Sequence, residues 1–184
     1  MAGVLIGAAV FGVGISLIKG SGGGVRDVIG NASAPWLLLP FVAGAVAGER
    51  RVARAALIGL LASLVAVIGF YTAYVLVVLG IRPRSVSDFV HLALVSGARW
   101  LLLGAISGPV FGALGGSWRW RRSPVIGLLA ACLLLFEPPV WLVWARDSVR
   151  YPAVWGVEIA LGVLAAAIVC TLARTRERNS QTPQ

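Results

Sequence analysis

Two acidic residues stand out as candidates for chemistry, because each lies inside an otherwise apolar stretch. Glu137 is followed by Pro138 and Pro139, and Glu158 lies near the start of the last apolar stretch. An acid at membrane depth costs ~2.5–3.5 kcal/mol on insertion scales and usually faces the interior of a helical bundle. Such a carboxylate either holds a proton or a ligand, or is locked in a buried ion pair.

Other polar side chains on neighbouring apolar stretches share the depth of these two acids. Together they predict an outer-facing polar cavity that binds a small solute. The predicted binding residues are Glu137, Glu158, Arg99, Tyr71 and Tyr74. Pro138 and Pro139 leave backbone carbonyls unpaired, so we also expect the helix to be broken beside Glu137.

A structural role for the same charges is the alternative. In that interpretation Glu137 pairs with Arg99, and Glu158 pairs with Arg150 or Arg146. Intramembrane charges are commonly functional, but these lie away from the middle of their spans. The sequence therefore leaves the cavity and the buried ion pairs as open alternatives.

Helices that cross a membrane must position these side chains. Apolar residues make up 59% of the 184 residues, and the mean hydropathy is +0.90. Runs of about 20 apolar residues span a bilayer, and in lipid they must be helical. We predict an all-α membrane protein, a bundle of about six transmembrane helices without a soluble domain. The predicted six-helix domain is residues 1–173, with spans near 2–18, 28–48, 55–81, 100–118, 123–145 and 151–173, and residues 174–184 form a polar cytoplasmic tail.

The net charge of +9 comes mostly from arginines that flank these spans. Three dense clusters lie on one side of the predicted bundle, and the positive-inside rule places that side in the cytoplasm. The clusters are Arg50, Arg51 and Arg54; Arg119, Arg121 and Arg122; and Arg174, Arg176 and Arg178. We expect a bacterial plasma-membrane protein with both termini cytoplasmic, and residues 82–98 as the longest outer connection, with a short interfacial helix.

Four glycines follow one another at intervals of four residues in the fourth predicted span. They are Gly104, Gly108, Gly112 and Gly116. This spacing puts all four on one helix face, where a second helix can approach closely. The face packs either inside the monomer or against a partner protein, and the small-residue face of the first span is a candidate for its neighbour.

Recognisable catalytic and cofactor motifs are missing from the chain. There is one histidine, His91, and we find no metal-binding motif and expect no catalytic residue, metal or cofactor. Cys132 and Cys170 both fall inside predicted spans, which favours packing over a disulfide. The basic residues flank spans, so we expect the lipid bilayer as partner, with a membrane protein or a second copy as a further candidate, and no nucleic acid.

Two segments resemble a known family. Asn31-Ala32-Ser33-Ala34-Pro35-Trp36 and Gly108-Pro109-Val110-Phe111-Gly112 are similar to segments of a family of small actinobacterial integral membrane proteins of unknown function. The resemblance extends over most of the chain. The resemblance implies a six-helix membrane topology, and it implies no particular activity.

In size and span number the chain also resembles the substrate-binding components of energy-coupling-factor vitamin transporters. Those proteins dock a partner through small residues on the first helix, and Ala8 and Gly12 match that feature. This resemblance is at the level of architecture only. Two functions follow: a protein that binds or transports a small solute, or a non-catalytic membrane subunit or scaffold that docks partners through the glycine-rich face.

Overall fold

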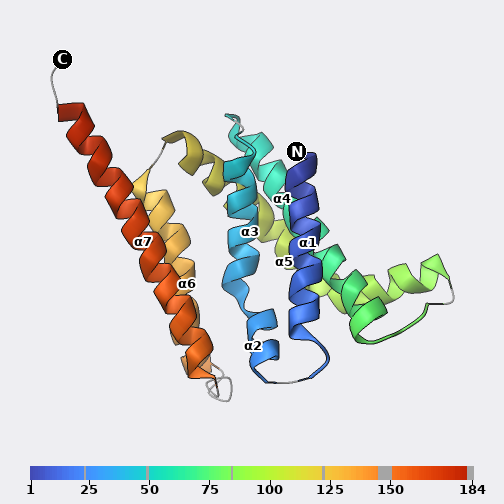
Figure 1. The fold of residues 1–184 in the computed structure, drawn as a ribbon. Coiled ribbons are helices and arrows are strands. Elements are labelled where there is room, and N and C mark those ends of the chain that lie inside the picture. The colour runs from blue at the N-terminus through green and yellow to red at the C-terminus, as the bar shows by residue number, and fades with distance from the viewer. Residues whose placement is uncertain (23, 49, 84, 122, 145–150, 182–184) are drawn as a thin grey trace.

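The protein is helical throughout the part that the structure describes. The computed structural model describes residues 1–22, 24–48, 50–83, 85–121, 123–144 and 151–181, and these contain no strand (Figure 1). The helices are α1 (Ala2–Lys19), α2 (Val25–Asn31), α3 (Ser33–Val46), α4 (Val52–Ala73), the π-helix η1 (Tyr74–Val78), α5 (Val86–Arg121), α6 (Pro124–Trp144) and α7 (Pro152–Gln181). The prediction of an all-α bundle is confirmed.

Five helical segments are long and apolar enough to cross a membrane. They are Ala2–Lys19, Val25–Val46, Val52–Val78, Leu94–Arg121 and Pro152–Ala173, and α6 adds a shorter apolar stretch, Pro124–Val140. Large apolar side chains such as Ile6, Leu102 and Val163 are exposed on the outer faces of the helices. Such an apolar exterior is typical of a surface that contacts lipid rather than water.

Helix α4 is the central helix, and it packs against α1, α3 and α5. Helices α6 and α7 lie side by side as a pair, which joins the rest of the bundle mainly through α3, α5 and α2 (Figure 1). The start of α1 and the end of α7 lie at the same end of the molecule. Near that end Arg50, after α3, lies 4.7 Å above the ring of Trp120 on α5, so two of the basic clusters are neighbours.

Small residues form the contacts around α4. Ala55, Ala62 and Ala66 are completely buried, and a Cβ added to Gly12 of α1 would lie 1.9 Å from the carbonyl oxygen of Ala66. Close backbone approach of this kind is the usual way in which helices associate in lipid. The small face of α1 therefore packs on α4, and the expectation that it meets the glycine face of α5 is wrong.

The interruption of a helix near Glu137 lies in a different helix from the one that the sequence predicted. The second apolar stretch is interrupted at Ala32 (ψ 128°), and α3 then starts with Pro35 in its first turn, where a missing N–H costs no helical bond. Helix α6, in contrast, continues through Pro138 and Pro139. The expected break beside Glu137 is therefore wrong, and the break lies on the helix that faces Glu137.

The expected outer connection at residues 82–98 is also mostly helical. Helix α5 begins at Val86 and continues without interruption into the fourth span. Phe89, Val90 and the apolar residues after them therefore extend α5 instead of forming a separate interfacial helix. Helix α7 likewise continues to Gln181, so its backbone carries helical structure into the predicted polar tail.

Candidate functional site

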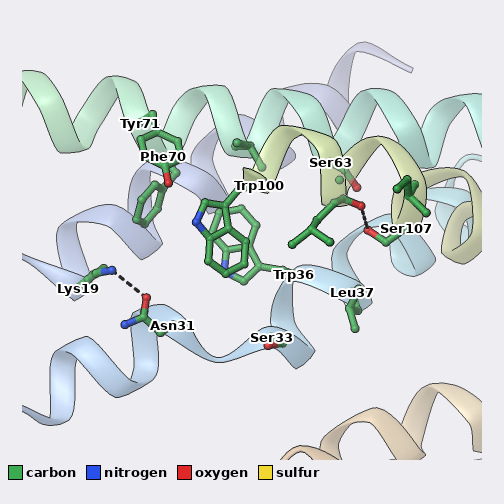
Figure 2. Close-up of a pocket in the computed structure, with 15 residues that line it drawn as sticks. Lys19, Asn31, Ser33, Trp36, Leu37, Ser63, Phe70, Tyr71, Trp100 and Ser107 are labelled. Carbon is green, nitrogen blue, oxygen red and sulfur yellow. Dashed lines mark hydrogen bonds between the residues drawn. The ribbon is translucent and has the colours of Figure 1, made fainter. Parts of the chain in front are cut away.

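A pocket of about 250 Å³ lies between the α1–α2–α3 segment and helices α4 and α5. Its wall is mainly aromatic and aliphatic (Figure 2). The aromatic residues are Trp36 on α3, Phe70 and Tyr71 on α4, and Trp100 on α5. The volume is slightly below the ~300–1,000 Å³ of typical small-molecule sites, so the pocket suits a small molecule with a largely apolar body.

Contacts between rings hold the aromatic wall in place. Trp36 meets Phe11 and Phe70 edge to face, with ring centroids 5.3 Å and 5.6 Å away. Tyr74 stacks on Phe70, with ring centroids 5.9 Å apart. Edge-to-face and offset aromatic pairs are stabilising beyond the area they bury, so the wall is built before any ligand arrives. Tyr74 thus supports the wall, and Tyr71 forms part of it.

One end of the pocket is polar and charged. The Lys19 ammonium at the end of α1 donates a hydrogen bond to the Asn31 side-chain oxygen at 2.8 Å (Figure 2). It also lies 3.6 Å from an Asp27 carboxylate oxygen. Arg26 caps the end of α1 by donating to the carbonyl oxygens of Leu17 and Ile18, each at 2.7 Å. The charged groups at this end are therefore arranged around the α1–α2 connection.

Hydroxyl groups line the pocket away from the charged end. Ser107 donates to the carbonyl oxygen of Leu103 at 2.7 Å within α5 (Figure 2). Ser63 on α4 is only 4% exposed, and its hydroxyl has no hydrogen-bond partner among the described residues. Buried polar groups are nearly always satisfied, so a lone buried hydroxyl on a pocket wall is a natural contact for a bound polar atom.

Glu137 lies outside this pocket and caps a helix. Its two carboxylate oxygens accept hydrogen bonds from the backbone N–H groups of Ser33 and Ala34, at the start of α3. The N-cap residue of α3, Ala32, has no polar side chain, so an acid from α6 takes the place of a local cap. The acid also lies at the positive end of the α3 dipole, which stabilises a negative charge.

Arg99 is not the partner of Glu137. Arg99 is exposed on α5 and makes no ion pair with an acid in the part of the chain that the structure describes. Helix α3 stands between much of α5 and the α6–α7 pair, and its backbone supplies the donors instead. The predicted Glu137–Arg99 pair is therefore wrong.

Glu158 is buried beside Glu137. It is 7% exposed, and its carboxylate oxygens accept no hydrogen bond from a described N–H or hydroxyl group. The two carboxyl groups are close enough to interact electrostatically, so the structure brings together the two acids that the sequence singled out. The suggested partners Arg146 and Arg150 lie outside the described residues, and that pairing stays a prediction.

The predicted cavity therefore separates into two places. Among the described residues that line the pocket, only Tyr71 belongs to the predicted set. Asn31 and Ser33 were also expected among the polar groups of the cavity and do line the pocket, whereas Lys19 and Ser63 were missed. Lys19 could have been recognised from the sequence, because it is the only lysine in the chain and ends the first apolar stretch. Ser63 could not, because its position on the pocket wall depends on how the helices pack.

The four ridge glycines face α4. Each is buried, and a Cβ added to Gly108, Gly112 or Gly116 would lie within 3.0 Å of atoms of α4. At Gly104 the nearest atom, the Ser63 Cβ, would be 3.5 Å away, where the pocket begins. Because α4 covers the ridge, this face is not exposed for a partner protein.

Comparison with known proteins gives a family without an assigned activity. The chain matches the family of unknown function DUF6518 over residues 1–182, and it belongs to that family. No curated protein and no solved structure matches the chain. A family of unknown function over the whole chain is what the resemblance implied, whereas the actinobacterial source is not part of the match and stays a prediction.

Proposed function

We propose that this protein binds a small, largely apolar molecule with one polar end in the pocket between α1 and α5, as a membrane solute-binding or transport protein. The observation that carries the proposal is the combination of a preformed aromatic wall with the buried hydroxyl of Ser63, which has no hydrogen-bond partner among the described residues. An apolar pocket with a few placed polar groups is the usual form of a small-molecule site.

The charged end of the pocket restricts the ligand. Lys19 already has Asn31 and Asp27 as neighbours, so the part of the ligand at this end needs to form hydrogen bonds but does not need a negative charge of its own. The competing proposal, a scaffold that docks through the glycine ridge, has no support from the ridge itself, because α4 occupies it. A binding role also needs no catalytic group, which agrees with the lack of a catalytic motif in the sequence.

Native mass spectrometry of the detergent-solubilised protein tests the proposal. Ser107→Phe places a ring in the pocket, whereas Val110→Phe places the same ring on the exposed face of the same helix. We expect the wild type and Val110→Phe to retain a bound molecule and Ser107→Phe to lose it. Two results would contradict the pocket as the binding site. One is a molecule that all three proteins retain equally, such as a membrane phospholipid on the outer surface. The other is a wild type that retains no molecule.

A further inference from the structure

The pocket is open along one of its walls, that of α5. Trp100, Leu103 and Ile106 all line it, yet they are 47%, 54% and 62% exposed. Residues three apart are neighbours on a helix surface, so these three form a continuous row. The α4 residues on the pocket wall, such as Val67 and Phe70, are buried instead. The pocket is therefore closed at α4 and exposed at this row of α5, which we call the side opening.

Residue size explains why α3 and α5 separate at the side opening. At one end the two backbones are in direct contact, because Gly44 lies against Gly112. At the other end Trp36 of α3 and Trp100 of α5 extend into the space between the helices (Figure 2). Small residues allow helix backbones to approach closely in lipid, whereas two indole rings keep them apart. The side opening therefore follows from the residues placed along the two helices.

The side opening lies at the depth of lipid chains. Helix α5 contains the segment Leu94–Arg121, which is long and apolar enough to cross a membrane. At ~1.5 Å per residue, Ile106 lies about 18 Å from Leu94 and about 22 Å from Arg121, near the middle of that segment. The hydrocarbon core of a bilayer is about 30 Å thick, so Leu103 and Ile106 lie within it. A molecule reaches this opening from among the lipids rather than from bulk water.

The polar end of the pocket is less exposed than the side opening. The Lys19 side chain is 22% exposed, and its ammonium contacts Asn31 and Asp27. Lys19 is the last residue of the spanning segment Ala2–Lys19, so this end of the pocket lies near the level of lipid headgroups. Because Asp27 already balances the ammonium charge, this end suits an uncharged head that forms hydrogen bonds.

We propose that the ligand is a membrane lipid that enters sideways, between α3 and α5. Its compact, uncharged head occupies the pocket, with hydrogen bonds at Lys19 and Asn31 and at the Ser63 hydroxyl, and its apolar chain extends through the side opening into the bilayer. The pocket volume of about 250 Å³ is below that of typical small-molecule sites, which fits a ligand of which only one part is enclosed. This inference rests on the proposed function, because it names the chemical class of the ligand that the same pocket binds.

The identity of the retained molecule tests the chemical class. The detergent-purified wild type is extracted with chloroform and methanol, and both phases are analysed by mass spectrometry beside a total lipid extract of the same cells. We expect an uncharged molecule in the organic phase, enriched over its share of the total membrane lipid and lost in Ser107→Phe. A molecule lost in Ser107→Phe that partitions into water, or that carries a charged head, overturns the inference and leaves the proposed function intact. A wild type that retains no molecule contradicts the proposed function itself, and the inference fails with it.

A matched pair of variants tests the route of entry. Leu103→Trp fills the side opening, whereas Leu102→Trp places the same ring at the neighbouring position, which is similarly exposed and does not line the pocket. We expect Leu103→Trp to lose most of the retained lipid in native mass spectrometry and Leu102→Trp to keep it, with similar melting temperatures. Equal retention by the two variants overturns entry through the side opening.

Spin-label accessibility tests the side opening without any ligand. In liposomes, and in a background without Cys132 and Cys170, nitroxide labels are attached at Leu103→Cys, at Val110→Cys on the exposed face of α5 and at Ser21→Cys in the α1–α2 connection. We expect the label at residue 103 to collide with molecular oxygen, which concentrates in lipid, as the label at residue 110 does. Collision with a water-soluble nickel chelate, as at residue 21, would mean a water-filled opening and overturn the inference. Because this readout needs no ligand, it separates a failure of the side opening from a failure of the proposed function.

Discussion

Gly44 of α3 and Gly112 of α5 lie so close that a Cβ on Gly44 would be 2.1 Å from the Gly112 carbonyl oxygen. A Cβ on Gly112 would in turn be 2.5 Å from the carbonyl oxygen of Ala55 on α4. Three helices therefore meet at Gly112 with almost no side chain between them. Backbones approach in this way only where small residues coincide on each helix.

Substitution of Gly112 by leucine should strongly destabilise the bundle. The new side chain has no space between α3 and α4, and overpacking of a filled core typically costs about 1–3 kcal/mol or more. Thermal melting in detergent measures the effect. Gly7→Leu is the matched control, because a Cβ at Gly7 meets nothing within 4 Å. A Gly112→Leu protein that melts like the wild type would contradict the three-helix junction.

Glu137→Gln should lower stability more than Glu158→Gln. The glutamine amide keeps one acceptor oxygen for two N–H donors, and the favourable interaction with the α3 dipole is lost. Loss of a helix cap and of a charged hydrogen bond costs about 1–3 kcal/mol. Glu158→Gln removes no hydrogen bond from a described N–H or hydroxyl group, and the amide can still donate to the neighbouring Glu137 carboxylate, so its melting temperature should stay close to that of the wild type.

The reverse order of stabilities would contradict this account. A Glu158→Gln protein much less stable than Glu137→Gln would favour an ion pair between Glu158 and an arginine, because the arginine would be left buried without its partner. Measurements at several detergent compositions separate such an effect from a change in micelle binding.

Apolar length and glycine spacing predicted much of the fold, because both are local properties of the chain. Long charge-free runs indicate membrane helices, and the interval of four residues puts Gly108 and Gly112 on one face. Which helix would cover that face was not predictable: the cover is α4, and its contact with Gly112 depends on Gly59, a glycine without a comparable repeat. Which helices pair depends on how the surfaces of several helices fit together, and no single segment of the sequence contains that information.

The candidate site was predicted only in part for a similar reason. An acid within an apolar span is easily recognised, because placing it in lipid is costly, so Glu137 and Glu158 were identified from the sequence. Their partners were not, because the donors to Glu137 are backbone N–H groups exposed by the interruption at Ala32. Backbone donors are not tied to a residue type, and the local sign that a helix starts there was Pro35 shortly after Ser33.

The predicted orientation gives a labelling pattern that is independent of the pocket. Ser21 lies in the α1–α2 connection, and Ser123 lies between α5 and α6 beside the Arg119–Arg121 cluster. With both termini in the cytoplasm, Ser21→Cys should react with a membrane-impermeant thiol reagent in intact cells. Ser123→Cys should react only after the membrane is opened. The opposite pattern would invert the topology and place Glu137 and Glu158 in the cytoplasmic half of the bundle.

Tyr71 and Gly97 supply the last prediction, which concerns the shape of the pocket. A Cβ on Gly97 of α5 would lie 2.9 Å from the Tyr71 ring, so Gly97→Ala must displace a ring that forms part of the pocket wall. Phe70, whose ring centroid is 5.2 Å away, limits where the Tyr71 ring can move. We expect Gly97→Ala to melt close to the wild type but to retain less of the bound molecule in native mass spectrometry. The double variant Gly97→Ala with Tyr71→Leu should recover occupancy relative to Gly97→Ala, because residues in contact show non-additive effects. Equal occupancy in Gly97→Ala and the wild type would mean that the Tyr71 ring does not shape the site.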